Sequence, residues 1–284
     1  MGLILAAAFL QAILFLLFRV FDQRRIPLMP AIAVNYVVAT VCGLLYAPPW
    51  LAGDLAPLWW PSLGVGILFV GVFFLTGITA QRAGVAASTV ASKMSLVLTV
   101  LFAVVMYHES PGTWGWIGLL FAIISVVLGS WTARPRDGNA EWTLPFILFF
   151  GTACIDISIN AVQRFLLTPD TEAVFPTLAL GAAGILGMTM VLWQQGAAIL
   201  KAPSVWIGGG LLGIFNYGTL LFVVRALAQS GLPASSVFPL ISIGVILFGT
   251  LGSVALFKER VSRPQVVGII CAVIALILLF VAHA

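Results

Sequence analysis

The sequence predicts an all-α integral membrane protein of ten transmembrane helices, arranged as two inverted five-helix repeats. Two properties of the composition predict the class. Hydrophobic residues make up 62% of the 284 positions and charged residues only 8%, whereas a soluble domain carries about 25% charged residues. A third observation, an internal duplication, predicts the two halves.

Each predicted helix is an apolar run of about 18 residues or more, which is long enough to cross a bilayer. The runs cover residues 2–20, 29–46, 61–81, 86–106, 112–131, 144–165, 173–192, 205–228, 233–257 and 264–282. The first run has no preceding basic residue and no small-residue cleavage site, so we expect a retained helix. The connections are short, and no soluble domain is expected.

Basic residues concentrate on one side of the membrane if the ten helices alternate in direction. The connections after the odd-numbered helices hold Arg19, Arg24, Arg25, Arg82, Arg134, Arg136, Lys201, Lys258, Arg260 and Arg263. The opposite side holds only Arg164 and Arg225. The positive-inside rule therefore predicts a cytoplasmic (inner) membrane protein with both termini outside the cytoplasm. Because these charges are dispersed, no nucleic-acid partner is expected.

Two segments of the chain repeat each other in sequence. Residues 83–90 read Ala-Gly-Val-Ala-Ala-Ser-Thr-Val, and residues 230–237 read Ser-Gly-Leu-Pro-Ala-Ser-Ser-Val. Glu109 and Glu259 follow these segments, and each precedes a glycine by nine residues. We expect both glutamates to cap loops.

The duplication divides the chain into residues 1–134 and 135–284. Gln11 of the first half aligns with Asp156 of the second at an offset of 145. Each half contains five helices, an odd number, so the second half enters the membrane upside down. Inverted repeats of this kind are typical of transporters.

This repeated pattern, in a chain of ten apolar runs, resembles the drug/metabolite transporter superfamily and its EamA-type permeases. The resemblance implies secondary transport of small metabolites through a central cavity between the halves, and no enzymatic activity. The family commonly has Ser-x-x-Pro near the start of the fourth and ninth helices. The ninth keeps it as Ser236 to Pro239, but the fourth has Lys93 where proline is usual. Family members usually keep their termini in the cytoplasm. The distribution of basic residues in this chain predicts the opposite orientation, with both termini outside.

Two charged residues fall inside predicted spans. Lys93 lies in the fourth run and Asp156 in the sixth. A charge at the bilayer centre costs about 3 kcal/mol, so such residues usually face a cavity or a partner. Helical spacing also places Ser92 and Ser95 on one face of the fourth helix.

These observations define the candidate site. We expect Lys93 to attract a carboxylate or phosphate, and Asp156 to engage an amine or exchange a proton. The predicted substrate-binding residues are Lys93, Asp156, Asn160, Gln163, Asn216, Tyr217, Ser92, Gln11 and Asn35. Arg225 and Asp156 are predicted to act in gating or coupling.

Structural interpretations of the same residues stay open. Lys93 and Asp156 also fit a salt bridge that joins the halves, and Ser and Thr commonly hold membrane helices together. The glycine-rich run 208–213 lies inside a span, so we expect close helix packing there rather than nucleotide binding. His108 and His283 lie at helix ends without a ligand cluster, so no metal or other cofactor is expected; a proton is one option for the coupling ion.

The sequence therefore predicts a secondary transporter that moves a small polar, anionic or zwitterionic, amino-acid-like metabolite by alternating access. Its partners would be a small-molecule substrate and membrane lipid. A flippase for a lipid or lipid-linked intermediate is an alternative, as is a receptor or assembly subunit that does not transport. Substrate identity, direction, coupling ion and oligomeric state stay open.

Overall fold

The structure, a computed structural model, describes residues 1–82, 91–129, 143–257 and 263–281, and regular structure in these ranges is entirely helical. The long helices are α1 (Gly2–Arg24), α2 (Leu28–Tyr46), α3 (Trp59–Arg82), α5 (Leu96–Tyr107), α6 (Gly112–Gly129), α7 (Thr143–Phe165), α8 (Val174–Gln195), α9 (Pro203–Gln229), α10 (Ala234–Phe257) and α11 (Arg263–Val281). Short 3₁₀ helices are η1 (Pro49–Leu51), η2 (Ala56–Leu58) and η3 (Ala197–Lys201).

The helical membrane class is confirmed. Seven apolar stretches of the described chain are long enough to cross a membrane; they are Gly2–Arg24, Leu28–Leu51, Ala56–Thr76, Phe146–Phe165, Val174–Gln195, Pro203–Gln229 and Ala234–Phe257. Three shorter apolar helices cover Ala91–Tyr107, Gly112–Ser125 and Val266–Leu279. The predicted spans at these three places extend into residues outside the described ranges, so a count of ten crossings stays a prediction.

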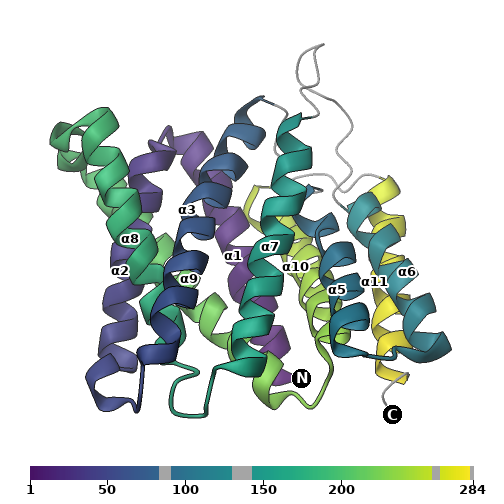
Figure 1. Ribbon diagram of the computed structural model, residues 1–284. Coiled ribbons are helices and arrows are strands. Elements are labelled where there is room, and N and C mark those ends of the chain that lie inside the picture. Colours follow the sequence, from purple (N-terminus) through teal and green to yellow (C-terminus); the bar gives the residue numbers. More distant parts are fainter. Residues whose placement is uncertain (83–90, 130–142, 258–262, 282–284) are drawn as a thin grey trace.

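The helices form one bundle, with α2 and α8 at one side and α6 packed on α11 at the other (Figure 1). Helix α1 begins and α11 ends at the same end of the bundle, which we call the termini end (Figure 1). Exposed tryptophans lie near both ends of the bundle. They are Trp50 in η1, Trp59 and Trp60 at the start of α3, Trp114 and Trp116 near the start of α6, Trp193 near the end of α8 and Trp206 near the start of α9. Helices α3 and α6 begin at the termini end, whereas α8 ends and α9 begins at the opposite end (Figure 1). Tryptophan is enriched at both membrane–water interfaces, so these positions fit a protein that spans the bilayer.

Helix α9 crosses α2 at very short range because of two glycines. A Cβ on Gly209 would lie 2.6 Å from the carbonyl oxygen of Ala31, and a Cβ on Gly213 would lie 2.5 Å from that of Asn35. Small residues allow this close approach of backbones in membrane helices. The packing role predicted for the glycine run is therefore confirmed for these two positions.

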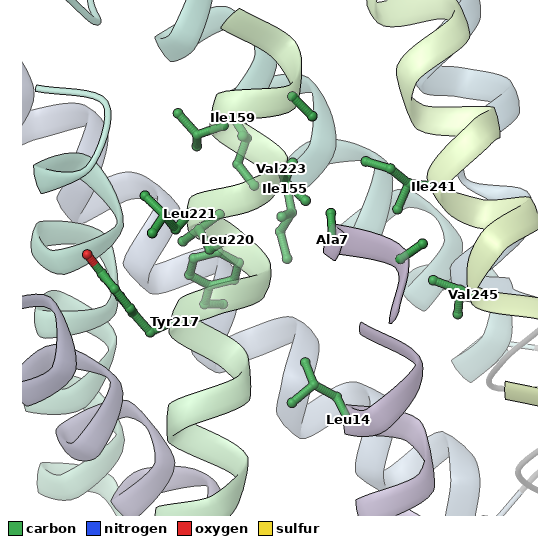
Figure 2. Close-up of a cluster of buried hydrophobic side chains, with 14 of the residues drawn as sticks. Ala7, Leu14, Ile155, Ile159, Tyr217, Leu220, Leu221, Val223, Ile241 and Val245 are labelled. Atoms are coloured by element: carbon green, nitrogen blue, oxygen red, sulfur yellow. The ribbon is translucent and has the colours of Figure 1, made fainter. Parts of the chain in front are cut away.

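An apolar cluster fills the bundle interior between α1, α7, α9 and α10 (Figure 2). Large buried side chains from these four helices meet there; they include Leu14, Ile155, Ile159, Leu220, Leu221, Ile241 and Val245. The cluster leaves the candidate polar residues embedded in a largely apolar interior.

Glu109, between α5 and α6, holds the start of α10 at the termini end. Its two carboxylate oxygens accept hydrogen bonds from the backbone N–H groups of Ala234, at 3.3 Å, and Ser235, at 2.9 Å. Arg164 of α7 also lies 3.7 Å from the carboxylate. A carboxylate at a helix N-terminus satisfies free donors and opposes the positive end of the helix dipole. The capping role predicted for Glu109 is confirmed, and Glu259 lies outside the described residues.

Candidate functional site

The candidate site is centred on Lys93, in a helical segment of residues 91–94. The side chain is buried, with 6% of the residue exposed. Its ammonium donates a hydrogen bond to Oε1 of Gln11 at 3.3 Å and lies 5.2 Å from the centroid of the Phe15 ring. Both partners belong to α1, one helical turn apart, so α1 provides a neutral acceptor and an aromatic face for one buried cation.

Asp156 of α7 approaches the same cation from the second half of the chain. Its carboxylate interacts electrostatically with Lys93 and lies within interaction range of the Ser95 hydroxyl. The structure therefore brings together three of the predicted residues, Lys93, Asp156 and Gln11. Gln11 and Asp156 are the residues that the duplication aligns, and both interact with Lys93, Gln11 by a hydrogen bond and Asp156 electrostatically.

An apolar helix covers Ala91–Tyr107 beside this cluster. Ser95 lies within it with helical backbone angles, φ −54° and ψ −24°, and its carbonyl oxygen accepts the backbone N–H of Thr99 at 3.1 Å. The Ser95 hydroxyl donates to the carbonyl oxygen of Ser92 at 2.6 Å. A serine hydroxyl carries a single proton, so the Ser92 carbonyl and the Asp156 carboxylate compete for it.

Asn160 and Gln163 lie further along α7. Asn160, one turn beyond Asp156, is 3% exposed, and its Nδ2 has no hydrogen-bond partner among the described residues. Gln163 is half-buried. A buried amide donor without a partner is costly, so Asn160 is a candidate for hydrogen bonding to a solute.

Asn35, Asn216 and Tyr217 form contacts between other helices. Nδ2 of Asn216 in α9 donates to Oδ1 of Asn35 in α2 at 3.2 Å. The Tyr217 hydroxyl donates to the carbonyl oxygen of Ala173 at 3.2 Å. These bonds join helices, and none of those described connects the three residues to Lys93 or Asp156. Their predicted role in substrate binding stays a prediction.

Arg225 of α9 lies in a second polar cluster, toward the termini end. Its guanidinium carbon lies 5.7 Å from the centroid of the Tyr46 ring, which in turn lies 6.4 Å from the Tyr217 ring centroid. Its Nε is buried without a hydrogen-bond partner among the described residues. Nearby, Nε2 of Gln229 donates to the buried carboxylate of Glu172 at 2.7 Å.

Sequence reasoning did not select several residues that line these two clusters. No sequence pattern singles out Phe15, Glu172 or Gln229, and helical spacing places Ser95 only on the same face as Ser92. Glu172 lies just before an apolar run, where a charged residue is ordinary. Phe15 is one of 20 phenylalanines in the chain and carries no distinguishing pattern. Only the three-dimensional packing identifies them.

Two cavities between the helices are apolar. One lies between α2, α3 and α8 and is lined by residues such as Ile32, Phe74 and Met190. The other is a groove between α1 and α10, lined by residues such as Phe9 and Phe248. Neither is lined by Lys93 or Asp156.

The described residues contain no group of three or more His, Cys, Asp or Glu side chains that could hold a metal ion. The three cysteines, Cys42, Cys154 and Cys271, are all free. The polar chemistry available at the site is therefore that of one ammonium, one carboxylate, side-chain amides and hydroxyls.

Comparisons with known proteins identify the first half of the chain. Residues 1–131 match the EamA-like transporter family, which confirms the resemblance predicted from the sequence. An uncharacterized protein of Haemophilus influenzae is 26% identical over 279 residues, covering 93% of this chain and 92% of its own. A "Putative sugar uptake protein" of Listeria monocytogenes is 23% identical over 205 residues, 68% of this chain and 66% of its own. One crystal structure, 16% identical, has a TM-score of 0.75 and covers 98% of this chain and 96% of that one; this likeness shows the fold.

Proposed function

We propose that the chain is a secondary transporter for a small polar solute, because residues 1–131 match the EamA-like transporter family. The solute would cross the cytoplasmic membrane by alternating access, without enzymatic chemistry. The observation that carries this proposal is the buried Lys93, which donates a hydrogen bond to Gln11 of the first half and interacts electrostatically with Asp156 of the second. Ionisable residues at membrane depth ordinarily mark the path of a substrate or ion.

The proposal includes ten membrane crossings in two inverted halves, residues 1–134 and 135–284. The packing of the helices supports it. If α1, α2, α3, α5 and α6 exchange with α7, α8, α9, α10 and α11, the pairs α2–α8, α5–α10 and α6–α11 map onto themselves. The same exchange turns the pair α1–α9 into α7–α3, the pair α1–α10 into α7–α5, and the pair α2–α9 into α8–α3. Each of these three pairs is in contact, and so is the pair into which it is turned. Two related halves around a shared site are the usual basis of alternating access.

The net charge of the site bears on the substrate. Lys93 and Asp156 carry opposite charges that act on each other, so the pair is neutral overall. A zwitterionic, amino-acid-like solute would replace that pairing with two of its own: its carboxylate or phosphate on Lys93 and its amine on Asp156. Asn160 and Gln163 would add hydrogen bonds. A solute with a net negative charge would instead be repelled by the carboxylate of Asp156.

A sugar-like solute is a second candidate. The names of the Listeria relatives point toward sugar uptake. The amides of Gln11 and Asn160, with the carboxylate of Asp156, are groups that hydrogen-bond hydroxyls. Phe15 provides an apolar surface beside them. Competition between an amino acid and a sugar alcohol in one uptake assay separates the two candidates.

Gating and coupling are assigned to Arg225 and Asp156. Asp156 would exchange a proton or the solute's amine with Lys93 during the cycle. Arg225 interacts with Tyr46 of the first half, so opening the termini end would break that contact. We assign both termini to the outside of the cytoplasm from the distribution of basic residues. The start of α1 and the end of α11 lie at the same end of the bundle (Figure 1), which fits termini on one side of the membrane without deciding which side.

Uptake into proteoliposomes tests the proposal. A panel of labelled amino acids and sugars is offered to wild type, Lys93→Ala and Lys201→Ala, the last being a matched loss of an exposed lysine in η3. We expect Lys201→Ala to resemble wild type and Lys93→Ala to lose uptake of the transported solute. Wild-type uptake by Lys93→Ala would remove Lys93 from the site, and no uptake of any solute by wild type would contradict transport of this class.

A further inference from the structure

Glu109 connects the two halves of the chain at the termini end. Its carboxylate belongs to the first half, and the groups that contact it belong to the second half. They are the backbone N–H groups of Ala234 and Ser235, at 3.3 and 2.9 Å, and the guanidinium of Arg164, at 3.7 Å. One side chain, itself only 9% exposed, therefore holds both α7 and α10 to the segment between α5 and α6.

Tyr107, the last residue of α5, adds an aromatic contact at the same place. The guanidinium carbon of Arg164 lies 4.5 Å from the centroid of the Tyr107 ring, and the centroid of the Phe165 ring lies 5.8 Å from it. Tyr107 also packs against a small apolar cluster that contains Ala103 of α5 and Ala234 of α10. The ends of α5 and α7 and the start of α10 therefore meet at the termini end (Figure 1).

The two helices that end there also carry the charged pair of the candidate site. Lys93 lies on the apolar helix Ala91–Tyr107, about four turns before its end, and Asp156 lies on α7, about two turns before Arg164. The contacts of Glu109 therefore lie between this pair and the solution at the termini end. If the two helix ends separate, the helices part along the route from the site to that solution.

We propose that Tyr107, Glu109 and Arg164 form the gate between the candidate site and the solution at the termini end. This inference rests on the proposed function, because a gate is needed only where the site opens to that side. On opening, water replaces the Glu109 carboxylate at the N-terminus of α10 and hydrates the carboxylate and the guanidinium. Exchange of hydrogen bonds with water costs little net free energy, so these contacts can hold one state and still release it in every cycle. Arg225 and Tyr46 would separate in the same movement.

Labelling of a thiol at position 160 tests the gate. Asn160→Cys places the thiol on α7, one turn from Asp156 and one turn from Arg164, at a position that is 3% exposed. The native cysteines are replaced by alanine, and a membrane-impermeant thiol reagent is applied to sealed vesicles of each orientation. Glu109→Ala should raise the rate of labelling from the termini side about fivefold, the equivalent of one helix cap, and the rate from the opposite side should be no faster. Asp170→Ala, the loss of an exposed carboxylate in the connection between α7 and α8, should change neither rate.

A second variant separates opening of the gate from loss of structure. Arg164→Gln breaks the ion pair but leaves the cap of α10 in place, so we expect a smaller gain from the termini side, about twofold. Faster labelling from both sides in either variant would overturn the gate, because loosening of the whole bundle would then explain it. An unchanged rate from the termini side in Glu109→Ala would also overturn it, and the proposed function would survive that result if wild type still takes up a solute. A wild type that takes up no solute would contradict the gate and the proposed function together.

Discussion

The contact of α9 with α2 gives a prediction whose size follows from the structure. A Cβ added at Gly213 would lie 2.5 Å from the carbonyl oxygen of Asn35 and 2.9 Å from Cβ of Val38. Carbon–oxygen contacts are ordinarily about 3.3 Å or longer, and the atom in the way belongs to the backbone. The two helices must therefore move apart, and overpacking of this kind costs about 1–3 kcal/mol.

Gly210 is the matched control for this substitution. It lies on the same helix, and a Cβ there would meet no atom within 4 Å. Gly210→Ala should be neutral or more stable by up to about 1 kcal/mol, because glycine is a poor helix residue. The measurement is the free energy of unfolding by SDS in mixed micelles. If Gly213→Ala proves as stable as Gly210→Ala, the close crossing of α2 and α9 is wrong.

Two further predictions concern polar contacts between helices. A double-mutant cycle of Asn35→Ala and Asn216→Ala, measured in the same unfolding assay, should give a coupling energy near 0.6 kcal/mol and below about 1.7 kcal/mol; additive effects would show that the amides do not interact. Glu109→Ala should cost about 0.5–2 kcal/mol by uncapping α10. Arg164→Gln should cost less than about 1 kcal/mol, because its side chain is 46% exposed and water screens the ion pair. A larger loss in Arg164→Gln than in Glu109→Ala would contradict the capping role.

The sequence is sufficient for the helical membrane class of this protein and for the selection of Lys93, Asp156 and Gln11; in the structure, Lys93 interacts with both of the others. Long apolar runs predict the helices, because hydrocarbon requires backbone polar groups to be satisfied within each helix. The cost of burying a charge singles out Lys93 and Asp156, and the repeat alignment relates Gln11 to Asp156. Their convergence on one lysine is a property of the fold that agrees with that alignment.

What sequence reasoning cannot supply is the direction in which a polar side chain points within a helix bundle. Asn216 and Asn160 look alike as single amides in apolar runs. In the structure, Asn216 donates to Asn35, whereas the amide nitrogen of Asn160 has no partner in the described part of the chain. The rotation of each helix about its axis decides between these outcomes, and it depends on contacts with other helices.

Access of water to the Lys93 site from each side of the membrane tests the central claim most directly. Ser92→Cys places a thiol beside Lys93 while keeping the lysine, in a background where Cys42, Cys154 and Cys271 are replaced by alanine. A membrane-impermeant thiol reagent is then applied to sealed vesicles of each orientation. The account predicts labelling from both sides, with the transported solute changing the ratio of the two rates. A thiol that reacts from neither side, or from one side at a rate no solute alters, would contradict it.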